Sequence, residues 1–346
     1  MKTLPKYLLI AWLVVFLLVM FGSCKKEEII DPVPDPTAYE LELPSYFPKM
    51  IIPEENPLTN EGVLLGRHLY YDPVLSEGGP MDGFSCSACH QQQTSFSKSG
   101  AGNAVLPHVN LAWNRNFLWN GKVSGRLEDI MLFEVEQFFQ TDLDQLRNDV
   151  KYPPLFKSAF GSEEISHEKA AYALAQFFRS LVSFESEFDS VILRKGVDTY
   201  SDLEAEGYLI FFSDRGDCFH CHTTPFMTNN QFSNTGLDDV FEGENRGLYN
   251  ITQNPGDMGK FKVPTLRNIA LTAPYMHDGR FNTLEEVIEH YNSGVKKSAT
   301  LDPIMTKAGK EFGLQLNEEE KASLVAFLKT LTDPNFVEDP RFGKPF

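Results

Sequence analysis

The sequence has few cysteines and few basic residues, and both shortages limit what the protein can be. Its 5 cysteines in 346 residues are too few for a disulfide-stabilised scaffold. Its 31 Lys and Arg are outnumbered by 48 Asp and Glu, which gives a formal charge of -17 at pH 7. Nucleic-acid binding needs clustered positive charge, so we expect no nucleic-acid partner. A docking partner is expected to be basic or small, unless the acidic excess serves only solubility.

The sequence also lacks an apolar run long enough for a permanent transmembrane helix at its start. The apolar stretch at residues 7–20 has 14 residues, where a membrane span needs about 20. Two lysines precede it and small residues lead from it into Cys24, as in a bacterial lipoprotein export signal. We therefore expect residues 1–23 to be a signal peptide, and the membrane contact to be only a lipid anchor on Cys24.

Residues 24–45 are predicted to be an acidic, proline-containing tether that holds the folded part off the membrane. They include the charged run Lys25-Lys26-Glu27-Glu28, followed by Pro32, Pro34 and Pro36. The predicted location is the bacterial cell envelope, lipid-anchored and facing the periplasm. Because the charged run directly follows Cys24, surface display remains an alternative.

The other four cysteines form two pairs, and a histidine follows each pair at once. The segments are Cys86-Ser87-Ala88-Cys89-His90 and Cys218-Phe219-His220-Cys221-His222. Both fit the C-x-x-C-H pattern, in which two thiols reach the vinyl groups of one porphyrin and the adjacent imidazole ligates its iron. This predicts two covalently bound haem c groups, with His90 and His222 as proximal ligands. A thioredoxin-like pair or a zinc site does not explain why the motif occurs twice.

The approach to each motif is similar, which predicts two cytochrome-c-like units in tandem. Glu61-Gly62-Val63-Leu64-Leu65 resembles Glu206-Gly207-Tyr208-Leu209-Ile210, and each opens an apolar helical stretch. The chain is long enough for two domains of ordinary size. The predicted ranges are residues 46–195 for an N-terminal haem domain and residues 196–346 for a C-terminal haem domain with a tail.

Apolar periodicity and capping residues predict three further helices. One begins near Ser166, with a stripe of Leu174, Phe177, Phe178 and Leu181. The second begins with a capping box at Thr283 and ends at Gly294. The third is capped by Asn317 and stops before Asp333-Pro334; its inward stripe is Leu324, Phe327, Leu328 and Leu331. Since few segments alternate like strands, the predicted class is mostly α with long loops.

Together, the motifs and their surroundings resemble the bacterial di-haem cytochrome c peroxidase family, which includes the MauG enzymes. The resemblance covers nearly all of the chain after the tether. Its most specific segments are Asn110-Leu111-Ala112-Trp113-Asn114, Phe117-Leu118-Trp119-Asn120-Gly121, Val263-Pro264-Thr265-Leu266-Arg267-Asn268 and Leu271-Thr272-Ala273-Pro274-Tyr275-Met276-His277-Asp278-Gly279. The resemblance implies that hydrogen peroxide is reduced at the N-terminal haem. Electrons would come through the C-terminal haem from a small cytochrome c or cupredoxin.

The resemblance also implies roles for residues that otherwise read as core or turn residues. Trp119 matches a tryptophan that lies between the two haems. The family holds a calcium ion at the domain interface; Asn110 matches its side-chain ligand, while Thr272 and Pro274 match residues that offer backbone carbonyls. We therefore expect one calcium ion. Whether the protein forms a homodimer is left open.

The sixth ligand of the C-terminal haem is expected to differ from that of the better-known peroxidases, which use methionine. Counting without gaps from Pro274 places Tyr291 there, the ligand type seen in the MauG branch. Met276 is the alternative ligand, and a core position is the alternative role of Tyr291. A phenolate stabilises oxidised iron, so a tyrosine-ligated haem is expected to be harder to reduce.

The N-terminal haem is expected to be open to peroxide without prior reduction. The better-known members carry a removable distal histidine after the first motif, but residues 91–107 contain no histidine. His108 follows them, and we expect it behind the haem ligands or at the surface. An open haem would meet peroxide directly.

The acid–base residue departs from the family pattern. The family uses a glutamate to move a proton between the peroxide oxygens, and matching from Trp119 places Gln140 there. Glutamine cannot take this proton, so Glu134, Glu136 or Asp142 is expected to fill the role.

Two other functions are alternatives to peroxide reduction. One is a MauG-like enzyme that uses peroxide to oxidise a protein or organic substrate, and the other is a non-catalytic electron carrier.

Overall fold

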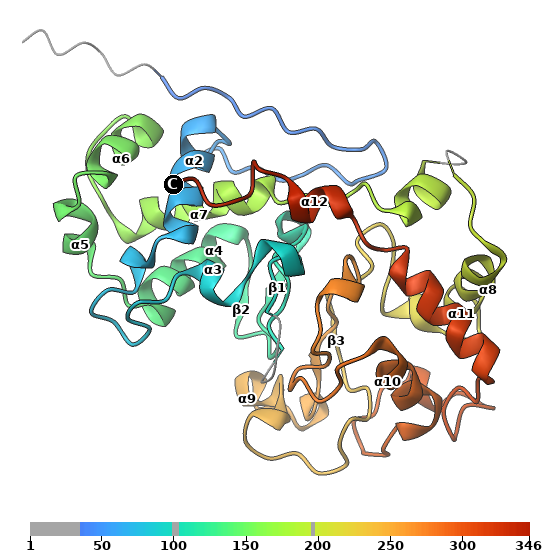
Figure 1. Ribbon diagram of the computed structural model, residues 1–346. Helices are drawn as coiled ribbons and strands as arrows, with labels where there is room; N and C mark the ends of the chain where they lie inside the picture. Colours follow the sequence, from blue (N-terminus) through green and yellow to red (C-terminus); the bar gives the residue numbers. More distant parts are fainter. Residues whose placement is uncertain (1–34, 99–103, 195–197) are drawn as a thin grey trace, which may run out of the picture. The chain divides into compact units, whose positions relative to one another are not determined.

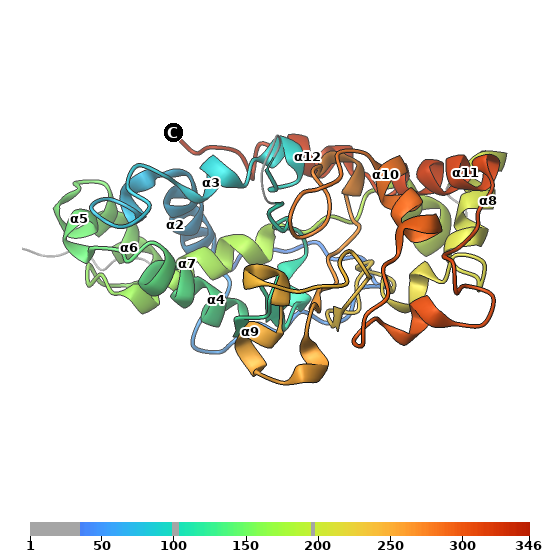
Figure 2. The ribbon, with the colours of Figure 1, turned by 90° about the horizontal axis from the view of Figure 1, so that it is seen from below.

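The computed structural model describes residues 35–98, 104–194 and 198–346, and these residues are mostly helical, as predicted (Figure 1; Figure 2). The predicted export signal and Cys24 lie outside them. The helices are α2 (Asn60–Tyr71), α3 (Cys86–Cys89), α4 (Leu127–Phe133), α5 (Leu143–Asn148), α6 (Tyr152–Phe160), α7 (His167–Ser180), α8 (Asp202–Phe211), α9 (Tyr249–Thr252), α10 (Leu284–Glu289), α11 (Glu318–Lys329) and α12 (Pro334–Glu338). Within the described ranges, every helix is too short or too polar to pass through a bilayer.

Regular sheet among these residues is limited to two short antiparallel pairs. Strand β1 (Asn116–Phe117) pairs with β2 (Val123–Ser124), and β3 (Phe232–Ser233) pairs with β4 (Phe261–Lys262). Three segments are π-helical turns: η4 (Glu134–Phe138), η5 (Asp189–Leu193) and η10 (His290–Gly294). Single 3₁₀ turns lie at Pro73–Leu75, Gln92–Thr94, Leu111–Trp113, Cys218–His220, Gly243–Arg246, Pro255–Asp257, Ile269–Leu271 and Pro303–Thr306.

Two pairs of helices pack closely, α2 against α7 and α8 against α11. We call the part built on α2 and α7 the first lobe and the part built on α8 and α11 the second lobe. A Cβ atom at Gly66 would lie 1.9 Å from the carbonyl oxygen of Ala173, and one at Gly207 would lie 1.9 Å from that of Ser323. Glycine therefore permits both close approaches. The sequence comparison matched Gly207 with Gly62. In the structure its counterpart is Gly66, one helical turn further along α2.

Each lobe has its own apolar core, and the predicted stripes contribute to both. Leu174, Phe177, Phe178 and Leu181 are buried in the first, and Leu324, Phe327, Leu328 and Leu331 in the second. The predicted boundary between the haem domains, at residues 195 and 196, lies outside the described residues. The predicted domain ranges therefore stay predictions.

The predicted helix starts are confirmed, as is the end at Gly294, but the predicted stop at Asp333-Pro334 differs. Ser166, Thr283 and Asn317 cap their helices through side-chain hydrogen bonds. The helix after Thr283 changes from α to π winding at His290 before it ends at Gly294. The helix after Asn317 ends at Lys329, and the Asp333-Pro334 pair begins α12 instead of stopping α11. Proline suits the first turn of a helix as well as the position after its end, so the stop signal was ambiguous.

The end of the chain returns to the first lobe. Phe336 and Phe342 belong to the first core. Arg67 of α2 donates hydrogen bonds to the carbonyl groups of Pro340 and Gly343. Figure 1 shows this C-terminal segment in red beside α2 and α7. The chain therefore crosses between the lobes twice, once after α7 and once after α11.

Candidate haem sites

A cavity in the second lobe contains the second motif together with the residues predicted to lie opposite it. Its walls include Cys218, Cys221, His222, Met276 and Tyr291. Most of the remaining lining is apolar, with Phe211, Leu237, Leu266, Ile269, Ile288, Leu324 and Leu328. An apolar site with two thiols and an imidazole in its wall fits a porphyrin attached by thioether bonds.

His222 is oriented by a backbone carbonyl. Its Nδ1 donates a hydrogen bond of 3.1 Å to the carbonyl oxygen of Met227, which leaves Nε2 for a metal. Burial lowers the pKa of His222 to about 4, so the imidazole is neutral at neutral pH. A neutral imidazole is the form that binds iron.

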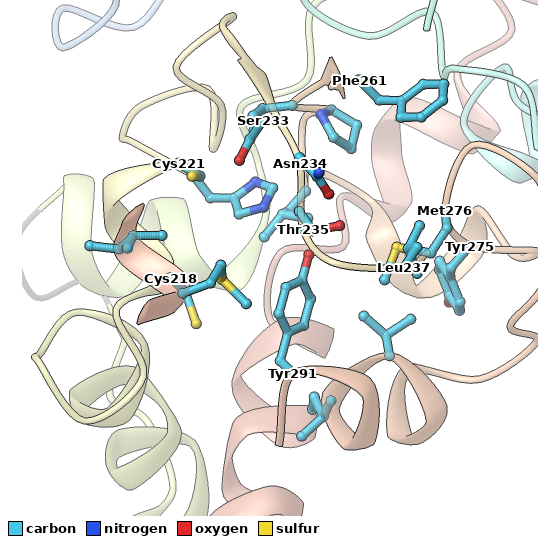
Figure 3. A pocket seen from close by; sticks show the side chains of 18 of the residues that line it. Cys218, Cys221, Ser233, Asn234, Thr235, Leu237, Phe261, Tyr275, Met276 and Tyr291 are labelled. Atoms are coloured by element: carbon cyan, nitrogen blue, oxygen red, sulfur yellow. The ribbon is translucent and has the colours of Figure 1, made fainter. Parts of the chain in front are cut away.

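Tyr291 points into the cavity between the two cysteines on one side and Met276 on the other (Figure 3). Burial, followed by the neighbouring Cys221 and Cys218, raises the pKa of Tyr291 well above its usual range. The phenol is therefore close to both attachment thiols. Met276 lies to the side, next to Tyr275 (Figure 3). This arrangement favours Tyr291 over Met276 as the group that faces His222.

The first motif has the same local arrangement. Nδ1 of His90 donates a hydrogen bond of 2.9 Å to the carbonyl oxygen of Phe96, and burial lowers the pKa of His90 to about 4. Both acceptor residues, Phe96 and Met227, have left-handed backbone conformations, with φ of 56° and 54°. Burial raises the pKa of the Cys86 thiol, and the nearby charge of Glu134 raises it further.

The cysteine environments do not fit the two alternatives to haem. A thioredoxin-like pair needs a thiol with a lowered pKa. Here burial raises the pKa of Cys218 to about 12 and that of Cys221 to about 11. Zinc binding needs several converging ligands, and no group of three His, Cys, Asp or Glu side chains in the described part of the chain is placed to hold a metal ion.

His108 lies behind the proximal ligand, the first of its two predicted places. Its ring stacks on that of His90, with 3.6 Å between the ring centroids and 17° between the planes. The Tyr70 hydroxyl donates to the carbonyl oxygen of His90 at 2.9 Å and lies 3.3 Å from Nδ1 of His108. Two axial ligands of one iron face each other end to end, whereas these rings lie face to face. His108 is therefore not placed to act as a sixth ligand.

The acid–base candidates lie in different surroundings. Glu134, in the turn η4, is partly buried, and the burial of its carboxyl group raises its pKa to about 7. Glu136 is exposed, with Oε1 3.8 Å from Nδ1 of His167. Asp142 caps α5 by accepting a hydrogen bond from the backbone of residue 144. Gln140 is exposed in a left-handed conformation, with φ of 53°. Of these four, Glu134 combines burial with proximity to the first motif.

Trp119 reaches from the first lobe to the wall of the second-lobe cavity. Its indole Nε1 donates to the carbonyl oxygen of Ala104 at 2.9 Å. Its own carbonyl oxygen accepts a hydrogen bond of 2.8 Å from the backbone N–H of Lys262 in β4. Trp119 is thus held by hydrogen bonds of its side chain and of its backbone, and its place between two haems stays a prediction.

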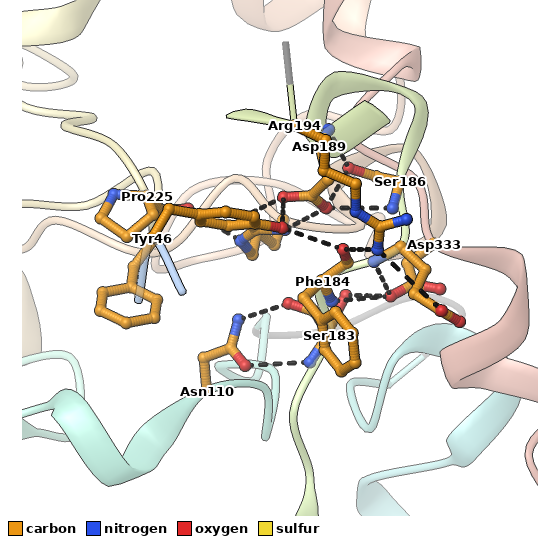
Figure 4. Close-up of polar contacts among 12 residues, drawn as sticks. Tyr46, Asn110, Ser183, Phe184, Ser186, Asp189, Arg194, Pro225 and Asp333 are labelled. Carbon is orange, nitrogen blue, oxygen red and sulfur yellow. Dashed lines mark hydrogen bonds and ion pairs between the residues drawn. The ribbon is translucent and has the colours of Figure 1, made fainter. Parts of the chain in front are cut away.

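Asn110, the predicted side-chain ligand of calcium, is buried and hydrogen-bonded to the backbone of Ser183. Its Nδ2 donates to the carbonyl oxygen of Ser183 at 3.0 Å, and its Oδ1 accepts from the N–H of the same residue at 2.9 Å (Figure 4). An amide oxygen has two lone pairs, so Oδ1 can accept this hydrogen bond and still bind a cation. The calcium site of Asn110, Thr272 and Pro274 therefore stays a prediction.

Arg267 and Asn268 connect the two loops that orient the histidines. Asn268 donates from Nδ2 to the hydroxyl of Ser95 at 2.9 Å, beside the carbonyl that holds the first histidine. Arg267 donates from Nε to the carbonyl oxygen of Pro225 at 2.9 Å, in the loop that holds the second. Both residues belong to a segment that carries the family resemblance, but their sequence positions indicated no role for them. Such contacts between distant loops leave no local pattern.

Two buried carboxylates complete the polar contacts between these loops (Figure 4). Asp189 accepts two hydrogen bonds of 2.8 Å from Arg267, and both side chains are almost fully buried. Asp333 accepts from the Ser183 hydroxyl at 2.8 Å and from the backbone N–H groups of residues 184 and 185 at 3.0 Å. Its own N–H donates to Oδ1 of Asn268 at 2.7 Å. The lobes are therefore joined by a continuous buried polar network.

Comparison with known proteins relates this geometry to di-haem proteins. Residues 60–197 match the family described as di-haem cytochrome c peroxidase. The chain is 34% identical over 295 residues to the methylamine utilization protein MauG of Methylorubrum extorquens, which covers 81% of this chain and 80% of that protein. It is 29% identical over 311 residues to the cytochrome c551 peroxidase of Nitrosomonas europaea, with 83% and 84% covered.

Solved structures agree with these sequence matches. A MauG-like protein associated with microbial copper homeostasis superposes with a TM-score of 0.79 and 32% identity, over 89% of this chain and 99% of that one. The diheme peroxidase BthA from Burkholderia thailandensis has a TM-score of 0.63 and 18% identity, over 84% and 91% of the two chains. The fold is therefore that of the di-haem peroxidases and their MauG-like relatives.

Proposed function

Because this chain belongs to the di-haem cytochrome c peroxidase and MauG family, we propose that it reduces hydrogen peroxide with electrons from a small redox protein. Peroxide would react at the haem attached to Cys86 and Cys89, and electrons would enter through the haem attached to Cys218 and Cys221. The two haem irons supply the redox chemistry. The donor would be a cytochrome c or a cupredoxin.

The observation that carries this proposal is the carboxyl group of Glu134. It lies near Cys86, and its pKa of about 7 lets it both accept and release a proton near neutral pH. Peroxide cleavage needs a group that takes a proton from one oxygen and gives it to the other. Glu136 and Gln140 are exposed, and Asp142 serves as a helix cap, so Glu134 is the candidate that the surroundings favour.

The electron path would run from the second lobe to the first through Trp119. Its side chain lines the cavity of the second motif, and its backbone is bonded to β4 at the cavity wall. The carbonyl groups of Phe96 and Met227 keep the two imidazoles in fixed orientations. Because little has to move when the iron charge changes, this fixed geometry supports electron transfer.

A stoichiometric peroxide titration with optical detection tests the proposal. Reduced cytochrome c should be oxidised after peroxide is added, two molecules for each peroxide, since peroxide takes up two electrons and two protons to give two waters. If neither the spectrum of the protein nor that of cytochrome c responds to peroxide, the protein is an electron carrier and the proposal fails.

A MauG-like oxidation of a protein or organic substrate is the second candidate function. The observation that favours it is Tyr291 in the wall of the second cavity, because a phenolate ligand stabilises oxidised iron. In that case one equivalent of peroxide should leave a long-lived oxidised protein that cytochrome c does not reduce quickly. If reduced cytochrome c instead returns this oxidised protein quickly to its resting state, the peroxidase function is favoured.

The proposed location is the periplasmic face of the cell envelope, with the mature chain anchored by a lipid on Cys24. This proposal has its support in the sequence of the export signal and in the haem attachment motifs, since both point to an exported protein. Replacing Cys24 with Ser should release the protein from the membrane fraction. Unchanged membrane association would contradict the lipid anchor.

A further inference from the structure

Lys262 is a buried lysine in the wall of the second-lobe cavity. It belongs to β4, the residue is 4% exposed, and it lines the cavity together with Cys221 and His222. Its backbone N–H is bonded to the carbonyl oxygen of Trp119. Lys262 therefore lies in the wall of the cavity, on the strand that is hydrogen-bonded to Trp119 of the first lobe.

The ammonium group of Lys262 has no carboxylate partner among the described residues. Its one hydrogen bond, of 3.4 Å, goes to the backbone carbonyl of Val263. Two carboxylates line the same cavity, Asp217 and Asp238, and both are already paired. The cations that pair with them are Lys307 and Lys310 for Asp217, and Arg280 and Lys296 for Asp238.

A buried ammonium without an anion is unfavourable, so this lysine needs a negative partner from outside the chain. Burial lowers the pKa of Lys262 only to about 8, so its amine is protonated in most molecules at pH 7. The anionic groups that a haem brings into such a cavity are the two carboxylates on its propionate arms. A carboxylate next to an ammonium in a dry site forms a strong charge-assisted hydrogen bond.

We propose that Lys262 binds a propionate carboxylate of the haem attached to Cys218 and Cys221. The inference rests on the haem attachment in the proposed function, and it adds a binding residue that the attachment motif does not contain.

The charge of Lys262 bears on the reduction potential of this haem. A positive charge in the cavity wall would favour the reduced form of the iron, which carries one positive charge less than the oxidised form.

The test is the reduction potential of the second haem in the mature di-haem protein, measured by spectroelectrochemical titration with the first haem as internal reference. Lys262→Met should shift the second haem to lower potential and leave the first unchanged, because the propionate loses its cation. Lys262→Arg should keep the wild-type potential. Lys310→Met is the matched control: this lysine lines the same cavity but already pairs with Asp217, so the potential should stay.

A second measurement identifies the partner directly. The reduced-minus-oxidised infrared difference spectrum should show a shifted carboxylate band in Lys262→Met but not in Lys310→Met. An unchanged potential and carboxylate band in Lys262→Met would overturn the inference, as would equal shifts in both variants. If Lys262→Met does not fold, Lys262→Gln replaces it with the same expectation. A failure of the proposed function can be distinguished from a failure of this inference. Wild-type protein without a second haem would be recognised by its mass before any variant is made.

Discussion

A single carboxyl group, Glu134, sets the acid–base chemistry available at the first haem site. A side chain with a pKa of about 7 is half ionised at neutral pH, which is the condition in which one group serves as base and then as acid. Its burial near the first motif, and not its position in the sequence, distinguishes it from the other acids of the segment. The matching position, Gln140, lies two residues beyond the end of this turn and is exposed.

Replacing Glu134 with Gln should slow the reaction with peroxide by roughly 10²- to 10⁴-fold. In the wild type the rate should rise with pH through about 7, because only the ionised carboxylate accepts the first proton. The variant should lose this rise. Stopped-flow mixing with peroxide between pH 5.5 and 8.5 measures both. Glu136→Gln is the control, and an equal loss of rate there would contradict the assignment.

Tyr291 is the second residue on which the chemistry depends. Replacing it with Phe removes the phenol oxygen and keeps the ring, so one haem should lose its six-coordinate low-spin optical spectrum. Met276→Leu should leave that spectrum intact, because Met276 lies to the side of the cavity. If the spectrum survives in Tyr291→Phe and disappears in Met276→Leu, methionine is the ligand.

At the scale of elements, two π-helical turns carry residues that are expected to serve the two haems. Glu134 lies in η4 and Tyr291 in η10. A π turn adds a residue to the helical repeat and turns a side chain out of the regular stripe, and such turns are frequent at functional sites. This explains why the sequence left Glu134, Glu136 and Asp142 as alternatives, since regular helical periodicity does not tell which side chain a π turn directs inward. The cysteine–histidine motifs were readable because their geometry is contained within five residues.

Gly66 and Gly207 set the closest helix contacts of the two lobes. Alanine at either position would place a Cβ atom 1.9 Å from a backbone carbonyl oxygen, so the helices would have to separate. We expect each variant to lose about 1–3 kcal/mol in the free energy of unfolding, as overpacked sites do. Denaturant unfolding followed by circular dichroism measures this. Gly256→Ala is the control, because its nearest contact would be 3.4 Å, and a loss there as large as at Gly66 would contradict the packing argument.

At the scale of the whole molecule, a buried polar network joins the lobes and connects the loops of both proximal histidines. It includes the Arg267–Asp189 pair and the hydrogen bonds of Asn268 with Ser95 and Asp333. The fold class and the two attachment sites were predictable from the sequence because they follow from local motifs and periodicity. The network was not, because Ser95 and Asn268 are separated by 173 positions and no local pattern connects them.

Calcium removal tests the ion that the family resemblance implies at the contact between the lobes. The amide oxygen of Asn110 accepts one hydrogen bond from the backbone of Ser183, which leaves a second lone pair for a cation. If Asn110 binds calcium, a chelator should lower the thermal unfolding temperature and slow the peroxide reaction, and added calcium should restore both. Unchanged values after chelation would contradict the calcium site.

The central claim is that one molecule combines an open haem for peroxide with a second haem ligated on both sides. Electron paramagnetic resonance of the oxidised, mature protein with spin quantitation tests it most directly. We predict one high-spin and one low-spin ferric signal of equal intensity for each chain. Two low-spin signals without a high-spin one, or only one iron for each chain, would contradict it.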